Sequence, residues 1–269
     1  MRTGVFGQLL NYYRFWLNSK PIGGHGIHSP YVYNLYTEVI EPDKKEKVFD
    51  KIEEYRKELK GCGISVIRKS IGESTNSGYR GEEVSLRKIA TSVAIPKHLG
   101  RLLYRLIQNY QPKTIIELGT SVGISTMYIA HDNSKASIFT IEGDEAVLGI
   151  AQNRFRKNGL TNIQTLSGVF DEQLPRILSE LNSVDFVFID GDHNGRSLIN
   201  YFNLLLPKIN EKTVIIVDDI RWSKNMEKAW DYICANAKVS ISIDLFRCGI
   251  LIFEKGIAKQ HFALRYGPY

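Results

Sequence analysis

The sequence predicts an α/β fold, a doubly wound, mostly parallel and Rossmann-like sheet of seven strands that ends in an antiparallel hairpin. From Thr114 onward, short β-branched runs alternate with longer amphipathic segments. Strands separated by helices of this length are joined by right-handed crossovers into a parallel sheet that is covered on both faces. Only Arg247, Cys248 and Gly249 separate the last two strands, and so short a connection permits only an antiparallel pair.

Hydrophobic periodicity places each element of this domain. The seven strands are expected at 114–118, 137–141, 163–166, 185–189, 213–217, 239–246 and 250–253. Helices are expected between them at 144–158, 173–181, 195–206 and 223–235, and one at 96–110 precedes the first strand.

The first 95 residues have a different pattern, which predicts a helical extension or lid (1–95) before the main domain (96–269). Helices are expected at 4–17, 31–40 and 44–60, and the Gly- and Ser-rich stretch 61–81 is typical of a mobile loop. The segment that holds His25 and His28 has two interpretations, a lid over a substrate pocket or a support that docks the helices on the core.

Composition excludes several classes of protein. At 43% hydrophobic and 24% charged, the 269 residues can bury a core, which excludes wholesale disorder. No apolar run approaches the ~20 residues that span a bilayer, and no secretory signal is apparent. Three widely spaced cysteines form neither a disulfide framework nor a zinc site, so we expect a cytoplasmic protein.

Positive charge is concentrated in residues 1–112, which contain 18 Lys and Arg against 11 Asp and Glu. Such an excess could attract an anionic substrate, RNA or a membrane surface. Within 44–60, however, the lysines alternate with glutamates, which is also typical of a solvated helix face.

The loop after the first strand is the first candidate site, because ligands of open α/β sheets bind at the carboxyl ends of the strands. Gly119 and Gly123 allow a tight turn and a close approach of backbone to ligand. A dinucleotide site would need a further glycine where Ser121 stands, and Glu117 would repel a pyrophosphate.

A hydrolase is a second alternative, because residues 119–123 read Gly-x-Ser-x-Gly between a strand and a helix. In α/β-hydrolases several strands precede the nucleophile, whereas this loop follows the first convincing strand. No later Asp and His pair has an obvious triad spacing, although Asp218 and His261 could serve as partners of Ser121.

The third alternative is S-adenosylmethionine, whose ammonium and sulfonium are cationic and which carries no phosphate. Glu117 suits such a ligand, and Glu142, at the end of the second strand, can accept hydrogen bonds from both ribose hydroxyls. After the third strand, Gly168, Val169 and Phe170 offer a close turn and apolar faces for adenine. All these features follow strand ends in order, which favours this alternative.

With these motifs, residues from about 96 to 254 resemble class I S-adenosylmethionine-dependent methyltransferases, and among them the catechol and caffeoyl-CoA O-methyltransferase group. The resemblance implies that Glu142 holds the ribose. It also implies that the methionine end is held by Glu117, Gly119, Ser121 and Ser125, with Gly123 in the same turn, and the adenine by residues 168–170.

Acids also end the fourth and fifth strands, where Asp190 and the pair Asp218 and Asp219 are expected at one sheet edge. Three carboxylates repel one another unless a cation intervenes, and oxygen ligands suit Mg²⁺ or another divalent ion. We therefore predict a metal at these three residues, with Asp190 also contacting the cofactor. In the resembling enzymes the third ligand is Asn, so Asp219 departs from their pattern.

His193 follows three residues after Asp190, where the catechol-type enzymes have a lysine base. A histidine can accept the proton of a metal-acidified hydroxyl, so we predict His193 and Asp190 as catalytic residues; the alternative for His193 is a helix cap.

The sequence thus predicts a methyltransferase that acts on a hydroxyl of a small molecule. The alternatives are an RNA methyltransferase and a non-catalytic module that binds the cofactor. A nucleic-acid partner is disfavoured because no RNA-binding module precedes the domain. The oligomeric state stays open, a homodimer included.

Overall fold

The computed structural model describes residues 5–20, 26–42, 45–68 and 82–267. The chain forms two compact units, one made of Met1–Pro42 with Leu178–Tyr269 and the other of Asp43–Ile177. The predicted division between residues 95 and 96 coincides with neither boundary and stays a prediction. The site residues therefore fall into two groups, one in each unit.

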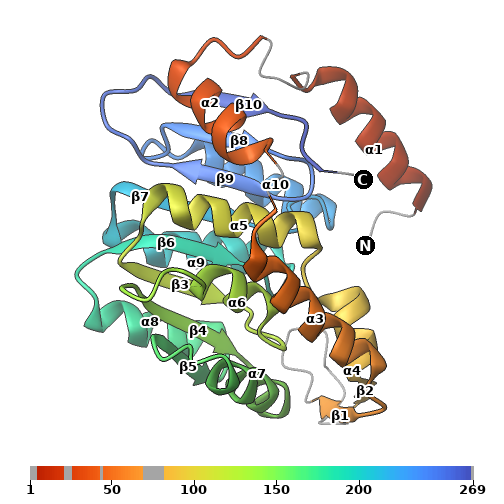
Figure 1. The fold of residues 1–269 in the computed structure, drawn as a ribbon. Coiled ribbons are helices and arrows are strands. Elements are labelled where there is room, and N and C mark those ends of the chain that lie inside the picture. The colour runs from red at the N-terminus through yellow and green to blue at the C-terminus, as the bar shows by residue number, and fades with distance from the viewer. Residues whose placement is uncertain (1–4, 21–25, 43–44, 69–81, 268–269) are drawn as a thin grey trace. The chain divides into compact units, whose positions relative to one another are not determined.

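The 43–177 unit contains three parallel strands in the order β3 (Thr114–Leu118), β4 (Ser137–Glu142) and β5 (Ile163–Ser167). The helices among them are α5 (Lys97–Tyr110), α6 (Ile124–Ala130) and α7 (Glu145–Lys157). Helix α5 packs on α6, and α7 packs on β4 and β5 (Figure 1). Parallel pairing brings the carboxyl ends of the three strands to one edge, as the sequence predicts.

The same unit begins with α3 (Lys47–Gly61), β1 (Ser65–Arg68), β2 (Glu82–Ser85), α4 (Leu86–Lys88) and a π-helical turn (Ile89–Val93). Strands β1 and β2 pair antiparallel. The prediction of a loop over 61–81 is therefore wrong for residues 65–68, which are held by cross-strand hydrogen bonds, and residues 69–81 lie outside the described residues.

A buried ion pair links the helices of this unit. Glu53 on α3 accepts hydrogen bonds from Arg56 Nε (3.1 Å) and from the Tyr128 hydroxyl (3.1 Å), and Lys97 Nζ lies 3.3 Å from it. Gly100 of α5 makes room for the Tyr128 ring, which a Cβ would approach to 2.4 Å. Glu53 is thus a buried carboxylate with all its charge compensated.

The other unit contains five strands in the order β10-β8-β9-β7-β6. Their bounds are β6 (Val184–Ile189), β7 (Ile209–Val217), β8 (Ile241–Asp244), β9 (Gly249–Ile252) and β10 (Gln260–Ala263). Strands β6 and β7 are parallel, and β9 is antiparallel to both β7 and β8. The predicted antiparallel hairpin is confirmed.

Apart from β1 and β2, the described residues of the two units form eight strands, one more than predicted. The additional strand is β10, which pairs parallel to β8. The prediction that the hairpin ends the sheet is therefore wrong. Only four residues form β10, and just one of its side chains, Phe262, is a strong β-former, so its sequence resembles a loop.

Helices α9 (Gly195–Leu205) and α10 (Lys224–Ala235) pack on each other in this unit, and a 3₁₀ turn (Leu206–Lys208) follows α9. Gly195 is required there, because a Cβ would lie 2.2 Å from the Asn225 carbonyl oxygen. Helix α8 (Phe170–Glu180) begins in the 43–177 unit and ends in this one. No helix among the described residues is both long and apolar enough to cross a bilayer.

The N-terminal helices α1 (Val5–Asn18) and α2 (Pro30–Leu35), with a π-helical turn (Tyr36–Ile40), belong to this second unit too. Backbone N–H of Lys20 donates to Ala263 (2.9 Å), and the Tyr36 hydroxyl donates to the Arg265 carbonyl (2.9 Å). These contacts favour the docking interpretation of the segment. His28 is exposed, and His25 lies outside the described residues.

Candidate functional site

The turn after β3 has the backbone geometry that the sequence predicts. Gly119 (φ 108°), Ser121 (φ 48°) and Gly123 (φ 83°) all have positive φ. A Cβ on Gly123 would lie 2.6 Å from the Phe155 ring of α7. Only glycine therefore fits at Gly123, and the turn it permits leads directly into α6.

Glu117 on β3 is fully buried, and its two oxygens differ. Oε2 accepts hydrogen bonds from the hydroxyls of Thr126 (2.5 Å) and Thr140 (2.6 Å). Oε1 is buried and accepts no hydrogen bond within the described part of the chain. Burial raises the pKa of Glu117, although the hydroxyls of Thr126, Thr140 and Ser125 oppose this by stabilising the charged form.

A buried carboxylate oxygen that accepts no hydrogen bond destabilises the protein, unless a bound ligand donates one. Glu117 Oε1 therefore needs a donor, and a cationic donor would also lower the raised pKa.

Glu142 at the end of β4 is held in place by backbone. Its Oε2 accepts from the N–H of Ser121 (2.8 Å) and its Oε1 from the N–H of Asp144 (3.0 Å). Asp144 itself caps α7. Each Glu142 oxygen keeps lone-pair capacity on a half-buried side chain, so a diol could still bind to it.

The third part of this cluster follows β5. Gly168 has φ 138°, and its N–H donates to the Glu142 carbonyl (3.0 Å). Val169 and Phe170 are half-buried, and Phe170 begins α8. The structure thus brings the turn residues, Glu142 and the Gly168 turn together at one edge of β3, β4 and β5.

The predicted metal ligands lie in the other unit, and Asp218 has a different partner there. It is 2% exposed, and its carboxylate accepts hydrogen bonds from Arg247 Nε (2.9 Å) and Nη2 (2.8 Å). Its N–H donates to the Ile189 carbonyl (2.9 Å). Asp218 is therefore committed to a bidentate ion pair.

A group of three half-buried ligands forms beside this pair. Ligand atoms of Asp190, His193 and Asp219 all lie within 4.8 Å of one another. His193 Nδ1 is 3.8 Å from Asp219 Oδ2, and Asp219 (φ 51°) adopts the left-handed conformation that turns it away from the strand. The structure thus substitutes His193 for Asp218 in the predicted cluster.

His193 is not a helix cap. Asn194 caps α9, because its Oδ1 accepts from the N–H of Arg196 (2.9 Å). The His193 ring instead lies 4.9 Å from the Trp222 ring at an interplanar angle of 33°. Trp222 therefore fixes the orientation of the imidazole at the edge of the cluster.

Sequence reasoning missed Arg247, which controls the charge of this region. Its Nη2 also lies 3.4 Å from Asp219 Oδ1. Burial lowers the pKa of Arg247, but Asp218, Asp219 and Asp190 raise it further, so the guanidinium stays charged. No signal in the sequence marks this partner, because Arg247 reaches Asp218 through the pairing of β9 with β7.

The hydrolase alternative finds no support in this unit. Asp218 is paired with Arg247, and His261 Nδ1 is hydrogen-bonded to Ser242 Oγ (2.8 Å). Neither side chain is thus available as the partner of a serine nucleophile.

Comparison with known proteins identifies the domain. Residues 116–220 match a family model described as a methyltransferase domain. O-methyltransferase hkm8 of Aspergillus hancockii is 35% identical over 126 residues, which cover 45% of this chain and 49% of that protein. Catechol O-methyltransferase of Niastella koreensis is 25% identical over 177 residues, 65% of this chain and 74% of that protein.

The fold is shared with solved structures. The O-methyltransferase from Bacillus cereus, in complex with S-adenosylhomocysteine, has a TM-score of 0.56 at 19% identity, covering 82% of this chain and 97% of that one. Residues 116–220 thus match a methyltransferase domain, and the fold is Rossmann-like. Its predicted resemblance to S-adenosylmethionine-dependent O-methyltransferases of the catechol and caffeoyl-CoA group is confirmed. The chain spans about half the length of the Aspergillus relative.

Proposed function

We propose that this protein transfers a methyl group from S-adenosylmethionine to a hydroxyl of a small molecule, with the help of a divalent cation. The observation that carries the proposal is the Glu117 carboxylate, fully buried with one oxygen unpartnered within the described residues. A cationic ligand without phosphate satisfies that oxygen, whereas a nucleotide phosphate would be repelled. The similarity to O-methyltransferases gives independent support.

The cofactor residues would act in the order of the strands. Glu117 and the turn from Gly119 to Gly123, with Ser125, would hold the methionine end. Glu142 would accept the two ribose hydroxyls, and Gly168, Val169 and Phe170 would enclose the adenine. The backbone bonds to Glu142 hold its carboxylate in place before ligand binds, which lowers the cost of ordering it.

The acidic cluster fits a divalent cation. Asp190, Asp218 and Asp219 carry three negative charges, and the Arg247 guanidinium offsets one of them. The remaining charge of −2 matches a divalent ion, for which Asp190 and Asp219 would supply oxygen ligands. A bound cation would lower the pKa of the acceptor hydroxyl.

His193 would act as the base beside this cation. Its ring is oriented by Trp222 and faces Asp219, so a ring nitrogen can accept the hydroxyl proton. Asp218 would act through Arg247, as a residue that positions the guanidinium rather than as a ligand.

The experiment that tests this proposal separates the base from the metal ligands. We expect His193→Gln to lower the rate of methyl transfer to catechol, used as a probe acceptor, by roughly 100-fold or more. Mn²⁺ affinity, measured by electron paramagnetic resonance, should fall less than about tenfold, because two carboxylates still bind the ion.

The wild-type protein and Trp16→Phe, which alters an exposed aromatic residue of α1, serve as controls. A loss of Mn²⁺ affinity as large as the loss of rate would make His193 a ligand and not the base. An unchanged rate in His193→Gln would remove the base assignment altogether.

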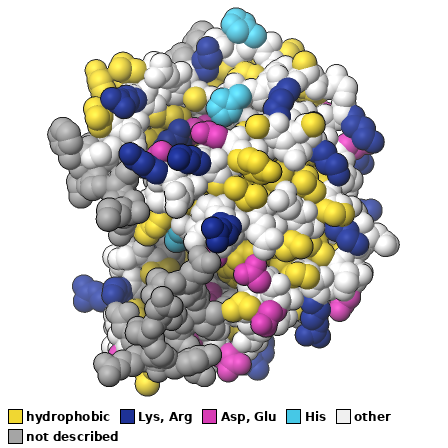
Figure 2. Space-filling view, turned by 180° about the vertical axis from the view of Figure 1, so that it is seen from behind, with side chains coloured by type: hydrophobic (Ala, Val, Ile, Leu, Met, Phe, Trp, Pro, Cys, Tyr) yellow, Lys and Arg dark blue, Asp and Glu magenta, His cyan; other side chains and the backbone are white. Residues whose placement is uncertain are grey.

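The alternative of an RNA methyltransferase gains no support from the face shown in Figure 2. On the face shown in Figure 2, Lys and Arg side chains occur singly or in small groups, with acidic and apolar side chains among them. Nucleic-acid binding relies on basic side chains gathered in a patch or stripe. A small-molecule acceptor is therefore the substrate class we propose.

A further inference from the structure

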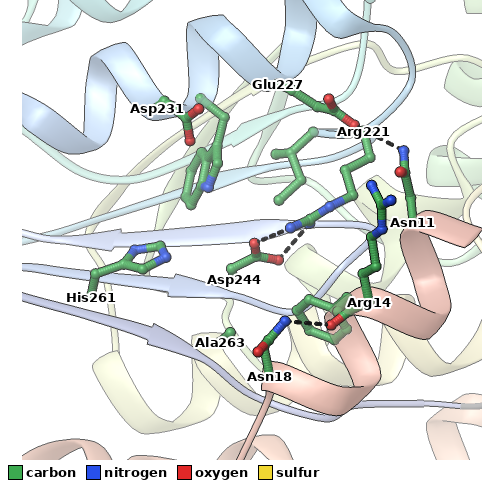
Figure 3. Close-up of a pocket in the computed structure, with 12 residues that line it drawn as sticks. Asn11, Arg14, Asn18, Arg221, Glu227, Asp231, Asp244, His261 and Ala263 are labelled. Atoms are coloured by element: carbon green, nitrogen blue, oxygen red, sulfur yellow. Dashed lines mark hydrogen bonds and ion pairs between the residues drawn. The ribbon is translucent and has the colours of Figure 1, made fainter.

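A polar cavity of about 400 Å³ lies within the unit made of residues 1–42 and 178–269. Its walls come from α1, α10 and the strands β8 and β10, with Arg221 between them (Figure 3). None of the predicted cofactor, metal or catalytic residues lines it. Its volume is within the range of small-molecule sites, so a ligand of modest size fits.

One charged pair in the cavity is satisfied internally. Arg221 forms a bidentate pair with Asp244, with Nη1 to Oδ1 at 2.7 Å and Nη2 to Oδ2 at 2.5 Å (Figure 3). Arg221 Nη1 also donates to the Phe246 carbonyl (2.9 Å). This pair forms the floor of the cavity and leaves neither residue in need of a ligand.

Two other charged side chains of the cavity lack partners. Within the described residues, the Arg14 guanidinium on α1 and the Asp231 carboxylate on α10 form no hydrogen bond or ion pair, with each other or with any other residue. Glu227, one turn before Asp231, has one long hydrogen bond from Asn11 Nδ2 (3.5 Å). Among the described residues, the cavity thus presents an unpaired cation from α1 and an unpaired carboxylate from α10, with the weakly hydrogen-bonded Glu227 one turn away.

The wall contains a buried donor as well. Trp230 is 3% exposed, and its Nε1 has no acceptor within the described part of the chain. The ring packs against Gly249 of β9, since a Cβ there would lie 2.2 Å from the indole. Trp230 is therefore fixed in position in the wall of the cavity.

Separated charges of opposite sign select the ligand class. A simple anion would meet Glu227 and Asp231, and a simple cation would meet Arg14, so each would gain one favourable contact and one unfavourable contact. A molecule with both a carboxylate and an ammonium pairs each with its opposite. Phe15 and Ile220 supply apolar wall for a side chain.

We propose that this cavity binds a free α-amino acid. Its carboxylate pairs with Arg14, and its ammonium pairs with Asp231 and Glu227. The site is distinct from the methyl-transfer site and does not depend on the function proposed above.

The test follows the indole N–H resonance of Trp230 in the full-length protein labelled with ¹⁵N. The chain has three tryptophans, so Trp230→Phe assigns the resonance by its loss. The standard L-amino acids are titrated one at a time, and at least one should shift the Trp230 resonance in a saturable way.

The amino acid that binds best is then compared with two analogues, one without the amino group and one without the carboxylate. Each analogue should bind about tenfold more weakly or worse, because each loses a charge-assisted hydrogen bond. If no amino acid shifts the resonance, or if either analogue binds as well as the amino acid, the proposal is overturned.

Two exposed positions provide matched variants that leave the fold intact. Arg14→Ala should abolish the preference for the amino acid over the analogue without carboxylate, and Asp231→Asn the preference over the analogue without amine. Arg176→Ala, at an arginine of α8 outside the cavity, is the control and should leave both preferences unchanged. Shifts that persist equally in Arg14→Ala and Asp231→Asn would contradict the assignment.

Discussion

Glu117→Gln is expected to weaken binding of S-adenosylhomocysteine by roughly 30- to 150-fold, or about 2–3 kcal/mol. The substitution keeps the size of the side chain and can keep the hydrogen bonds from Thr126 and Thr140. It removes the negative charge that the ligand ammonium would meet at Oε1, on a side chain that is fully buried. Isothermal titration calorimetry measures the effect directly.

The Glu117→Gln substitution should also remove a pH dependence of S-adenosylhomocysteine binding. Burial raises the pKa of Glu117 above its ordinary value, so a neutral Glu117 persists in the free protein to higher pH than an exposed glutamate would. Affinity of the wild type should therefore rise with pH until Glu117 is fully charged, and affinity of Glu117→Gln should not.

Stability of the ligand-free protein should change in the opposite direction. The folded state favours the protonated carboxyl of Glu117. Its contribution to the free energy of unfolding is therefore full below the ordinary pKa of a glutamate and declines as pH rises through the raised pKa.

Glu53→Gln is the matched control for Glu117→Gln. It makes the same change at another buried glutamate of the same unit, whose charge is already compensated by Arg56 and Lys97. This control should lower thermal stability and leave ligand affinity within about threefold. Equal losses of affinity in the two variants would mean that Glu117 acts only through the fold.

Asp219→Asn is expected to weaken Mn²⁺ binding about 10- to 100-fold, because the amide oxygen of asparagine can still bind the ion but carries no negative charge. Asparagine tolerates the left-handed conformation of Asp219, so the backbone is preserved. The loss then reports on the carboxylate charge. Electron paramagnetic resonance of Mn²⁺ and competition with Mg²⁺ measure it without an activity assay.

The chain offers a close control in Asp192→Asn. Asp192 has the same left-handed conformation (φ 59°), but its carboxylate accepts a hydrogen bond from the Tyr201 hydroxyl (3.2 Å) and is not in the three-residue group. Mn²⁺ affinity should change little in this variant. An equal fall in both variants would show that overall negative charge, rather than a ligand at Asp219, attracts the ion.

The sequence predicted the parts of the fold that depend on local pattern. Alternating apolar runs and amphipathic helices located β3 to β9 within a few residues, because parallel strands buried on both faces are continuously apolar. Strand β10 was missed because its four residues pair with β8 through backbone hydrogen bonds, which leave little trace in side-chain pattern.

The sequence predicted the parts of the candidate site whose functional residues directly follow a strand end. The turn at Gly119–Gly123 has the expected positive φ values, and Glu142 lies beside it. The pairing of Asp218 with Arg247 was not predictable, because 29 residues separate them and they meet through the antiparallel pairing of β9 with β7. Adjacent aspartates on a chain cannot reveal which of them faces a cation and which faces an arginine.

The central claim is that the β3–β4–β5 edge binds a sulfur nucleoside with a cationic ammonium group rather than a phosphate-bearing nucleotide. Calorimetric titration of the full-length protein with S-adenosylhomocysteine, and separately with NADH, tests it most directly. We predict saturable binding of S-adenosylhomocysteine at one site per chain and no heat of binding with NADH. Binding of NADH in the absence of any binding of S-adenosylhomocysteine would contradict the assignment.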